Sequence, residues 1–386
     1  MSSKNESPRK TGASLQTRTI GLIVNPVAGM GGAVGLKGTD GKTILKEAIL
    51  LGAKPIAPTR AKFFLSELST AQKAYRIVVG AGSMGEDETK NFDFDIAILG
   101  ERKDETTAKD THQIAERMAD AGVNLLVFCG GDGTARDVLK AVGRALPVLG
   151  VPTGVKMHSA VFAVSPQAAA RVVIAFLEDE LPLREAEVMD VDEKAFREGH
   201  LSAELYGFVL TPYEPHLIQG TKMASHITES ELRNQAAIAI YVIENLQQNV
   251  IYILGPGTTT RTIGDLLDMK KTLLGVDLFF NKSIIANDVN EQQILKAIHG
   301  KSTQIIVTPI GGQGFIFGRG NQQISAEVIR QVGLDNIVVV ATESKLRSLQ
   351  GSLKVDTGSS DLDSAFRARK LRVVADYKTE YLLSVE

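Results

Sequence analysis

Short apolar runs alternate with amphipathic stretches over the first half of this chain. The runs are unbroken enough to be strands buried on both faces, and they lie at 19–24, 76–79, 94–99, 125–128 and 147–152. Stretches with helical spacing lie between or after them, at 42–51, 106–121 and 167–177. Strands that alternate with helices predict βαβ units and a mostly parallel sheet, with ligand sites at the carboxyl ends of the strands.

The pattern changes near 181–184, where residues 187–191 and 206–210 are predicted to be strands of a second domain. Strand and helix units then return, with strands at 250–254, 304–309, 336–341 and 371–375 and a helix at about 261–270. We therefore expect an α/β fold of two domains. A Rossmann-like parallel-sheet domain would occupy 18–184, and a second α/β domain with a mixed sheet would occupy 185–386. Residues 1–17 are polar and are predicted to be a disordered tail.

Composition narrows the class of protein. A formal net charge of -2 gives no bulk attraction to nucleic acid or to anionic lipid. No apolar run approaches the length of a membrane span, and the N-terminus lacks a signal-peptide core. The single cysteine, Cys129, excludes an internal disulfide and is expected to be a small buried residue. These features predict a cytoplasmic protein that does not bind nucleic acid.

One loop carries the most chemical information. The apolar run 125–128 leads through Cys129 into Gly130-Gly131-Asp132-Gly133-Thr134, and helical periodicity follows from 135 to 142. Glycines allow backbone N–H groups to approach an anion closely, and a helix N-terminus adds unpaired N–H groups and partial positive charge. Asp132 would lie where phosphates and a divalent cation meet, so the loop indicates phosphoryl transfer. A turn carboxylate or a helix N-cap is the alternative for Asp132.

Three further glycine loops follow predicted strands, at 25–32, 150–154 and 255–260. Together the four loops indicate several phosphates bound at a sheet edge, although each alone is ordinary turn chemistry. The run Gly41-Lys42-Thr43 is not a P-loop, because Leu36 stands where that motif needs glycine. The dinucleotide pattern G-x-G-x-x-G is also missing at these strand ends, which disfavours a plain dehydrogenase.

These motifs resemble those of the superfamily of NAD kinases and diacylglycerol or sphingosine kinases. Gly130 to Thr134 matches its GGDGT motif. Asn25-Pro26 followed by Gly29 and Gly31-Gly32 resembles its opening motif, and 150–154 is similar to its third loop. Gly255 to Thr259 resembles a narrower branch, the ATP-NAD kinase-like proteins that include the acetoin-catabolism accessory family.

The resemblance implies an N-terminal domain of NAD kinase type, a cleft between the domains, ATP as donor, Mg²⁺ or another divalent cation, and NAD as substrate. The acceptor would be the 2′-hydroxyl of the adenosine ribose. Asp132 would orient or deprotonate that hydroxyl, or position the metal, whose other ligands stay unknown. The expected nucleotide-binding residues are Asn25, Gly31, Gly32, Gly130, Gly131, Gly133, Thr134, Thr153, Gly154, Gly257, Thr258 and Thr259. The resemblance also implies small-molecule nucleotides as partners and a homo-oligomer, a form that is common in this family.

The chain also departs from the NAD kinase pattern. The family's Asn-Glu/Asp pair that contacts NAD has no clear match, although Asp190 to Glu193 is an acidic candidate and Asn287-Asp288 comes much later. Lys156, His158 and Arg261 are candidates for ligand contact or are plain surface residues. Two alternatives to an NAD kinase therefore stay open. One is a kinase of another small alcohol or a lipid, and the other is a non-catalytic nucleotide-binding accessory protein.

Overall fold

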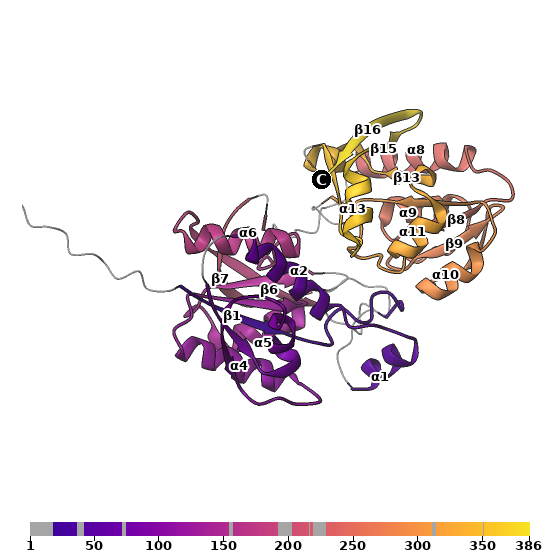
Figure 1. Ribbon diagram of the computed structural model, residues 1–386. Helices are drawn as coiled ribbons and strands as arrows, with labels where there is room; N and C mark the ends of the chain where they lie inside the picture. The colour runs from indigo at the N-terminus through magenta and orange to yellow at the C-terminus, as the bar shows by residue number, and fades with distance from the viewer. Residues whose placement is uncertain are drawn as a thin grey trace, which may run out of the picture.

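The structure is a computed structural model in which two α/β units follow one another along the chain (Figure 1). It describes residues 18–36, 42–71, 75–153, 157–191, 203–215, 217–218, 229–310, 314–349 and 351–386. The predicted tail, 1–17, lies outside the described residues. No helix among the described residues combines the length and the apolar character that crossing a bilayer requires.

The N-terminal unit is built on a five-stranded, wholly parallel sheet of order β3-β2-β1-β4-β5. Its strands are β1 (Thr19–Val24), β2 (Arg76–Gly80), β3 (Asp95–Leu99), β4 (Leu125–Gly130) and β5 (Val148–Pro152). Val24 pairs with Cys129 in register, and Gly130 pairs with Pro152. The carboxyl ends of β1, β4 and β5 therefore lie side by side, and the predicted parallel-sheet domain is confirmed.

Helices cover both faces of this sheet. On one face, α2 (Ala57–Ser69) and α6 (Pro166–Leu177) share a core with β1 and β4, and on the other face lie α4 (Ala108–Asp120) and α5 (Asp132–Val142). The shorter elements are α1 (Lys42–Leu50), the 3₁₀ turn η1 (Gly82–Met84) and α3 (Glu86–Thr89). Cys129 has no exposed surface in β4, and burial raises the pKa of its thiol, as expected of a packing residue.

A two-stranded antiparallel ribbon, β6 (Leu183–Val191) and β7 (Ala203–Pro212), follows the first sheet. Val188 and Val209 of the ribbon are buried in the same cluster as Val138 of α5. The ribbon thus packs on the N-terminal unit, and the expected division between residues 184 and 185 falls within β6. The division itself stays a prediction.

The C-terminal unit has a nine-stranded sheet of order β10-β9-β8-β11-β13-β15-β16-β14-β12. Its strands are β8 (Ile251–Leu254), β9 (Asp277–Phe280), β10 (Ser283–Ala286), β11 (Thr303–Val307), β12 (Phe315–Phe317), β13 (Ile337–Val340), β14 (Ser352–Val355), β15 (Lys370–Asp376) and β16 (Thr379–Val385). Strands β8, β11, β13 and β15 are parallel, whereas β9 runs antiparallel to both of its neighbours. β16 is antiparallel to β15 and parallel to β14. The predicted mixed sheet is confirmed.

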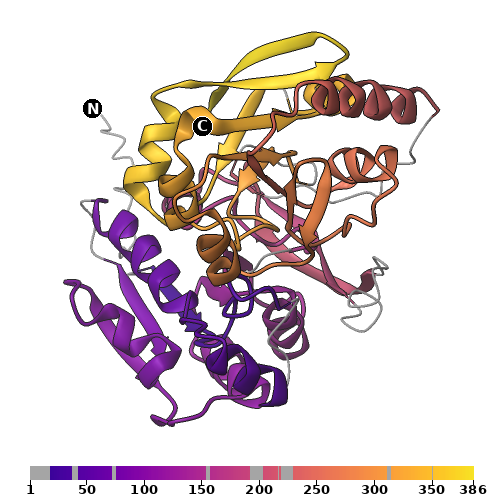
Figure 2. The same cartoon turned by 90° about the vertical axis from the view of Figure 1, so that its right-hand side faces the viewer.

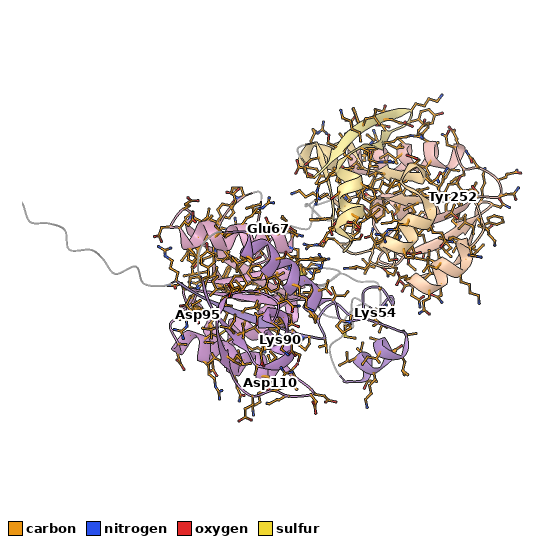
Figure 3. All side chains as sticks on the ribbon, viewed as in Figure 1. Lys54, Glu67, Lys90, Asp95, Asp110 and Tyr252 are labelled. Carbon is orange, nitrogen blue, oxygen red and sulfur yellow. The ribbon has the colours of Figure 1, made fainter. Side chains whose placement is uncertain are left out.

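Helices cover this second sheet on both faces as well. The helices are α8 (Glu229–Glu244), α9 (Thr258–Leu266), α10 (Glu291–Ile298), α11 (Ala326–Val332), α12 (Glu343–Ser348) and α13 (Ser360–Arg367). α8 and α9 share one apolar cluster, and α10, α11 and α13 contribute to the other. Figure 3 draws the side chains of both units, with Tyr252 marking β8 and Glu67 marking α2.

Polar contacts join the two units, which Figure 2 shows stacked one above the other. Arg60 of α2 forms an ion pair with Asp356, which follows β14, and both side chains are buried. Arg319, in the turn after β12, donates to the Val164 carbonyl oxygen at 2.6 Å. A third contact is the hydrogen bond of 3.1 Å from the Glu291 N–H at the start of α10 to the Ala33 carbonyl oxygen.

Candidate functional site

The three predicted loops of the N-terminal unit meet at the carboxyl edge of its sheet. The Asn25 Nδ2 group donates to the Thr134 hydroxyl at 2.9 Å, which joins the loop after β1 to the loop after β4. The Thr153 N–H donates to the Gly130 carbonyl oxygen at 3.2 Å, which joins the loops after β5 and β4. Adjacent parallel strands thus bring Asn25, Gly130, Thr134 and Thr153 together.

The loop after β1 approaches the loop after β5 very closely. Gly29 has φ +80°, and a Cβ atom there would lie 2.1 Å from the Thr153 carbonyl oxygen, so only glycine fits. Gly31 and Gly32 lie in the same loop, and their carbonyl oxygens accept from the N–H groups of Leu36 and Gly35. The Thr153 Oγ1 atom is buried and has no hydrogen-bond partner among the described residues. A ligand at this point would satisfy it.

The GGDGT segment places one open glycine at a helix N-terminus. Helix α5 begins at Asp132 with Gly131 as its N-cap, three residues before the predicted start at 135. A Cβ atom at Gly130 would lie 2.5 Å from the Thr134 Cβ atom, whereas one at Gly131 would meet nothing within 4 Å. Gly131 therefore lies beside free space, next to first-turn amides that have no acceptor within the helix.

Asp132 is buried and is held by the segment that follows β5. Its Oδ2 atom accepts from the His158 N–H at 2.7 Å and lies 3.2 Å from His158 Nδ1. Its Oδ1 atom accepts from the Ser159 N–H at 3.0 Å and from the Ser159 hydroxyl at 2.6 Å. A carboxylate has about four acceptor positions, and four polar atoms of residues 158 and 159 lie within hydrogen-bond distance of them.

The contact with His158 has a chemical consequence. If Nδ1 carries the hydrogen that faces Asp132, then Nε2 of the ring has a free lone pair and can accept a proton. A carboxylate that fixes the tautomer of a histidine in this way is the arrangement of acid–base dyads. The pair is therefore a candidate proton acceptor, in which Asp132 orients His158. The catalytic role of Asp132 stays a prediction.

Glu88 is a buried carboxyl group that the sequence reasoning missed. It lies in α3, in the connection that leaves the carboxyl end of β2, and is 4% exposed. Burial raises its pKa to about 7, and its Oε2 atom has no partner among the described residues. The signal was available, because Gly85 to Glu88 places three carboxylates soon after a predicted strand.

The fourth predicted loop lies in the other unit, at the carboxyl end of β8. Gly257 has φ +128° and caps α9, and a Cβ atom there would lie 2.5 Å from the Thr308 Cγ2 atom. Helix α9 therefore begins at Thr258, earlier than the predicted 261, and Thr259 lies buried in its first turn. Thr308 is buried with an unpartnered hydroxyl among the described residues.

Several polar residues outside the loops have ordinary structural partners. Arg261 lies 3.7 Å from Asp265 on α9, and half-exposed His112 lies 3.3 Å from Glu116 on α4. Asn287 donates to the Lys270 carbonyl oxygen. Gly154, Lys156, residues 192–193 and residues 38–41 lie outside the described residues.

Asp288 is exposed but lies beside a buried ion pair of the C-terminal unit. Its N–H donates to Asp277 at 2.7 Å, and Lys271 lies 3.5 Å from the same carboxylate. Burial lowers the pKa of Lys271 to about 8. The Lys271 ammonium group also donates to the Thr272 carbonyl oxygen at 2.9 Å, so internal partners hold it in place.

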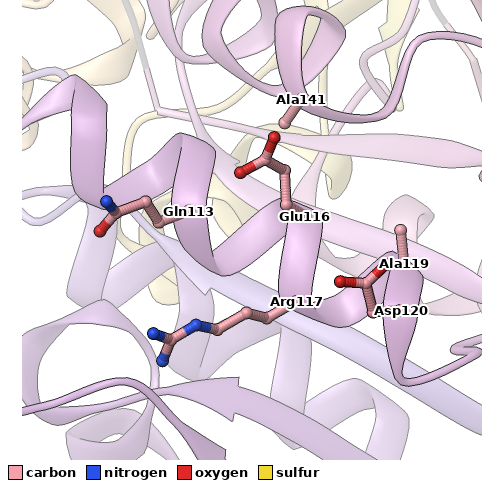
Figure 4. A pocket seen from close by; sticks show the side chains of 6 residues that line it. All are labelled: Gln113, Glu116, Arg117, Ala119, Asp120 and Ala141. Carbon is pink, nitrogen blue, oxygen red and sulfur yellow. The ribbon is translucent and has the colours of Figure 1, made fainter.

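The described residues offer no cluster of three His, Cys, Asp or Glu side chains that could hold a metal ion by themselves. A shallow polar hollow lies elsewhere, on the outer surface of α4 and α5 (Figure 4). It is lined by Gln113, Glu116, Arg117, Ala119, Asp120 and Ala141. None of the predicted site residues lines it.

Comparison with known families supplies independent evidence. The model of the ATP-NAD kinase N-terminal domain matches residues 20–181, and the model of the ATP-NAD kinase C-terminal domain matches residues 247–385. Together the two matches span both sheets. The search of curated proteins found no match.

Proposed function

Because the chain belongs to the ATP-NAD kinase family, we propose that it transfers the γ-phosphoryl group of ATP to the 2′-hydroxyl of NAD and forms NADP. The observation that carries the proposal is the buried Asp132–His158 pair beside the open Gly131. It combines an anion-binding helix terminus with a proton-accepting group, and phosphoryl transfer to a hydroxyl needs both.

The phosphates of ATP would bind at the edge formed by the three loops. The first-turn amides of α5 and the hydroxyl of Thr153, which has no partner among the residues that the structure describes, supply hydrogen-bond donors there. The open side of Gly131 leaves room for the phosphates. Asn25 fixes Thr134 and thereby fixes the loop after β1 relative to α5. Such fixed donors accelerate phosphoryl transfer by positioning and by neutralising charge.

The proposed reaction moves one proton and one phosphoryl group. The acceptor oxygen forms a bond to the γ-phosphorus while the bond from that phosphorus to the β,γ-bridging oxygen breaks, and ADP leaves. The hydroxyl proton passes to Nε2 of His158, and the Asp132 carboxylate stabilises the imidazolium that results.

A divalent cation would arrive with the phosphates. Mg²⁺ commonly binds through substrate phosphates, waters and one or two carboxylates, which suits a site whose described residues form no three-ligand cluster. When bound, the ion neutralises phosphate charge.

The proposal is tested by incubating the purified full chain with ATP, Mg²⁺ and NAD and detecting NADP with an NADP-specific dehydrogenase. The variant His158→Gln removes the proton acceptor and should lower kcat by about 10²–10⁴-fold. The matched control is His112→Gln, because His112 is half-exposed on α4 and should be dispensable.

The results of this assay distinguish an NAD kinase from the alternative functions. NADP formation that is lost in His158→Gln and kept in His112→Gln supports the proposal. ATP binding without NADP formation would move the activity to another alcohol acceptor or to nucleotide binding without turnover. Full activity of His158→Gln would exclude the proposed proton acceptor.

A further inference from the structure

The turn between β12 and α11 contains three consecutive amide side chains with unsatisfied oxygen atoms. Asn321 and Gln323 are 0% and 6% exposed, and Gln322 lies between them. The side-chain oxygens of all three are buried and accept no hydrogen bond within the described part of the chain. The Asn321 Nδ2 group does donate, to the Ile316 carbonyl oxygen at 2.8 Å, which fixes the orientation of that amide.

Three such acceptors in a row require an explanation. Leaving a buried acceptor unpaired costs about 1–3 kcal/mol, and most buried polar atoms in proteins have a partner. Hydrophobic side chains of similar size would avoid that cost. The presence of three polar side chains here, in spite of that cost, indicates that their oxygen atoms accept hydrogen bonds from a partner outside the chain.

The turn lies where the two units meet. Arg319, in the same turn, donates to the Val164 carbonyl oxygen and lies 3.5 Å from Asp356. Val164 follows the segment that holds Asp132, six residues after His158. Asp356 also pairs with Arg60, on the helix whose N-cap residue, Ile56, lies beside Gly29. The turn therefore contacts the N-terminal unit next to the phosphate-binding loops.

The local chemistry restricts what the partner can be. Three oxygen acceptors repel a phosphate or a carboxylate. The guanidinium groups of Arg60 and Arg319 both face the carboxylate of Asp356. The second positive charge disfavours the binding of a metal ion or an ammonium group. A neutral group with several N–H or O–H donors remains.

We propose that the turn 321–323 is a subsite for the exocyclic NH₂ group of a bound nucleotide. The inference rests on the proposed function, whose substrates carry such a group on adenine and on the nicotinamide carboxamide. One NH₂ group offers two donors, and neighbouring acceptors can share them. Sites that hydrogen-bond a substrate NH₂ discriminate against analogues that lack it, because their own groups are then left unpaired.

The first experiment compares ligands by calorimetry on the unmodified full chain. ATP is compared with ITP, and NAD is compared with nicotinamide hypoxanthine dinucleotide and with nicotinic acid adenine dinucleotide. At least one analogue without the NH₂ group should bind about tenfold more weakly or worse. The pair that differs identifies which NH₂ group occupies the turn.

The second experiment uses Gln323→Met, which keeps the side-chain length and removes the unsatisfied oxygen. Tm should stay the same or rise, because a buried unpaired acceptor is removed, while the preference for the NH₂-bearing ligand falls toward one. A purely structural glutamine would give a lower Tm. The matched control, Gln248→Met, alters an exposed glutamine and should change neither quantity.

The experiments distinguish failure of the proposed subsite from failure of the proposed function. Equal affinity for every pair of ligands overturns the subsite and leaves the proposed function intact. A lower Tm for Gln323→Met with unchanged ligand preference also overturns it. If the unmodified chain binds no nucleotide at all, the proposed function and the subsite fail together.

Discussion

At the scale of single residues, the site is defined by how each side chain's hydrogen-bonding capacity is used. Asp132 is surrounded by hydrogen-bond donors, whereas Thr153, Glu88 and Gln323 each keep a buried oxygen atom that has no partner within the described part of the chain. The hydrogen bonds to Asp132 make its loop rigid. The oxygen atoms without a partner are available to a ligand or a proton.

Asp132→Asn tests the role of the carboxylate. The amide turns one acceptor oxygen into an NH₂ group that faces N–H and O–H donors of 158–159, so the free energy of unfolding should fall by about 1–3 kcal/mol. Urea unfolding measures it, and Asp120→Asn, an exposed change, serves as the control. Unchanged stability with lost activity would instead support direct participation of Asp132 in catalysis.

Glu88 predicts a dependence of stability on pH. Its pKa is raised to about 7 by burial and by the neighbouring Asp87, while Lys62 and Lys90 oppose the rise. A raised folded-state pKa gives stability that is present below the ordinary pKa of 4.5 and is lost as pH rises through 7. Glu88→Gln should therefore match the unmodified chain near pH 4 and exceed its unfolding free energy by up to about 3 kcal/mol at pH 9.

Thermal unfolding of both proteins across this pH range measures the difference. Glu180→Gln, on an exposed turn, should show none. A constant difference between the unmodified chain and Glu88→Gln at all pH values would contradict the raised pKa.

At the scale of elements, the strand-to-helix connection carries the chemistry. In the β4–α5 connection, Gly130 packs closely against Thr134, whereas Gly131 faces open space. Two neighbouring glycines therefore have different reasons to be glycine. One serves packing, and the other is proposed to serve ligand approach.

The variants Gly131→Ala and Gly130→Ala separate these reasons. Gly131 has φ -111°, which alanine adopts freely, so its substitution should leave stability equal or slightly higher while weakening ATP binding. Gly130→Ala should cost about 1–3 kcal/mol through overpacking. Denaturant unfolding and ATP titration on both variants make the comparison. Loss of stability in Gly131→Ala would show that the space is not open.

The elements that could be predicted are those with strong local patterns. Buried strands such as β1 and β4 are short unbroken apolar runs, and the helix at 106–121 has strong amphipathic spacing, so periodicity was sufficient. Helix α2 was missed. The family assignment, based on loops rather than helices, is confirmed.

Tertiary contacts account for what the sequence did not predict. The Asp132 carboxylate bonds to residues 26 and 27 positions away, and Arg60 pairs with Asp356 across 296 positions. The ribbon β6–β7 has a strand pattern, but only the structure shows that it packs on α5. A local pattern contains no information on such partners.

At the scale of the whole molecule, a small set of buried charges joins two α/β units. Burial opposes ionisation of Asp356, yet Arg60 and Arg319 hold its pKa below the usual value. Burial lowers the pKa of Arg319 to about 10, so the cluster stays charged at neutral pH. Buried charges of this kind fix one relative placement of their partners more than they add stability.

Arg60→Met should uncouple the units. Removing one partner leaves Asp356 less compensated and should cost about 3–5 kcal/mol, and unfolding in urea should separate into two transitions. The exposed pair member Arg233 gives the control, since Arg233→Met should change stability by less than about 0.5 kcal/mol. A single transition with unchanged midpoint would show that the cluster does not couple the units.

The single cysteine of this chain is a probe of how often the first sheet opens. Cys129 is the only thiol in the chain and lies in β4, an interior strand between β1 and β5, with no exposed surface. Because a thiol reagent can reach it only when that strand opens, the labelling rate reports the opening equilibrium of the first sheet when reclosing is fast. Nucleotides that bind the neighbouring loops would slow labelling in proportion to their occupancy, so affinity can be measured without knowing the reaction that the protein catalyses.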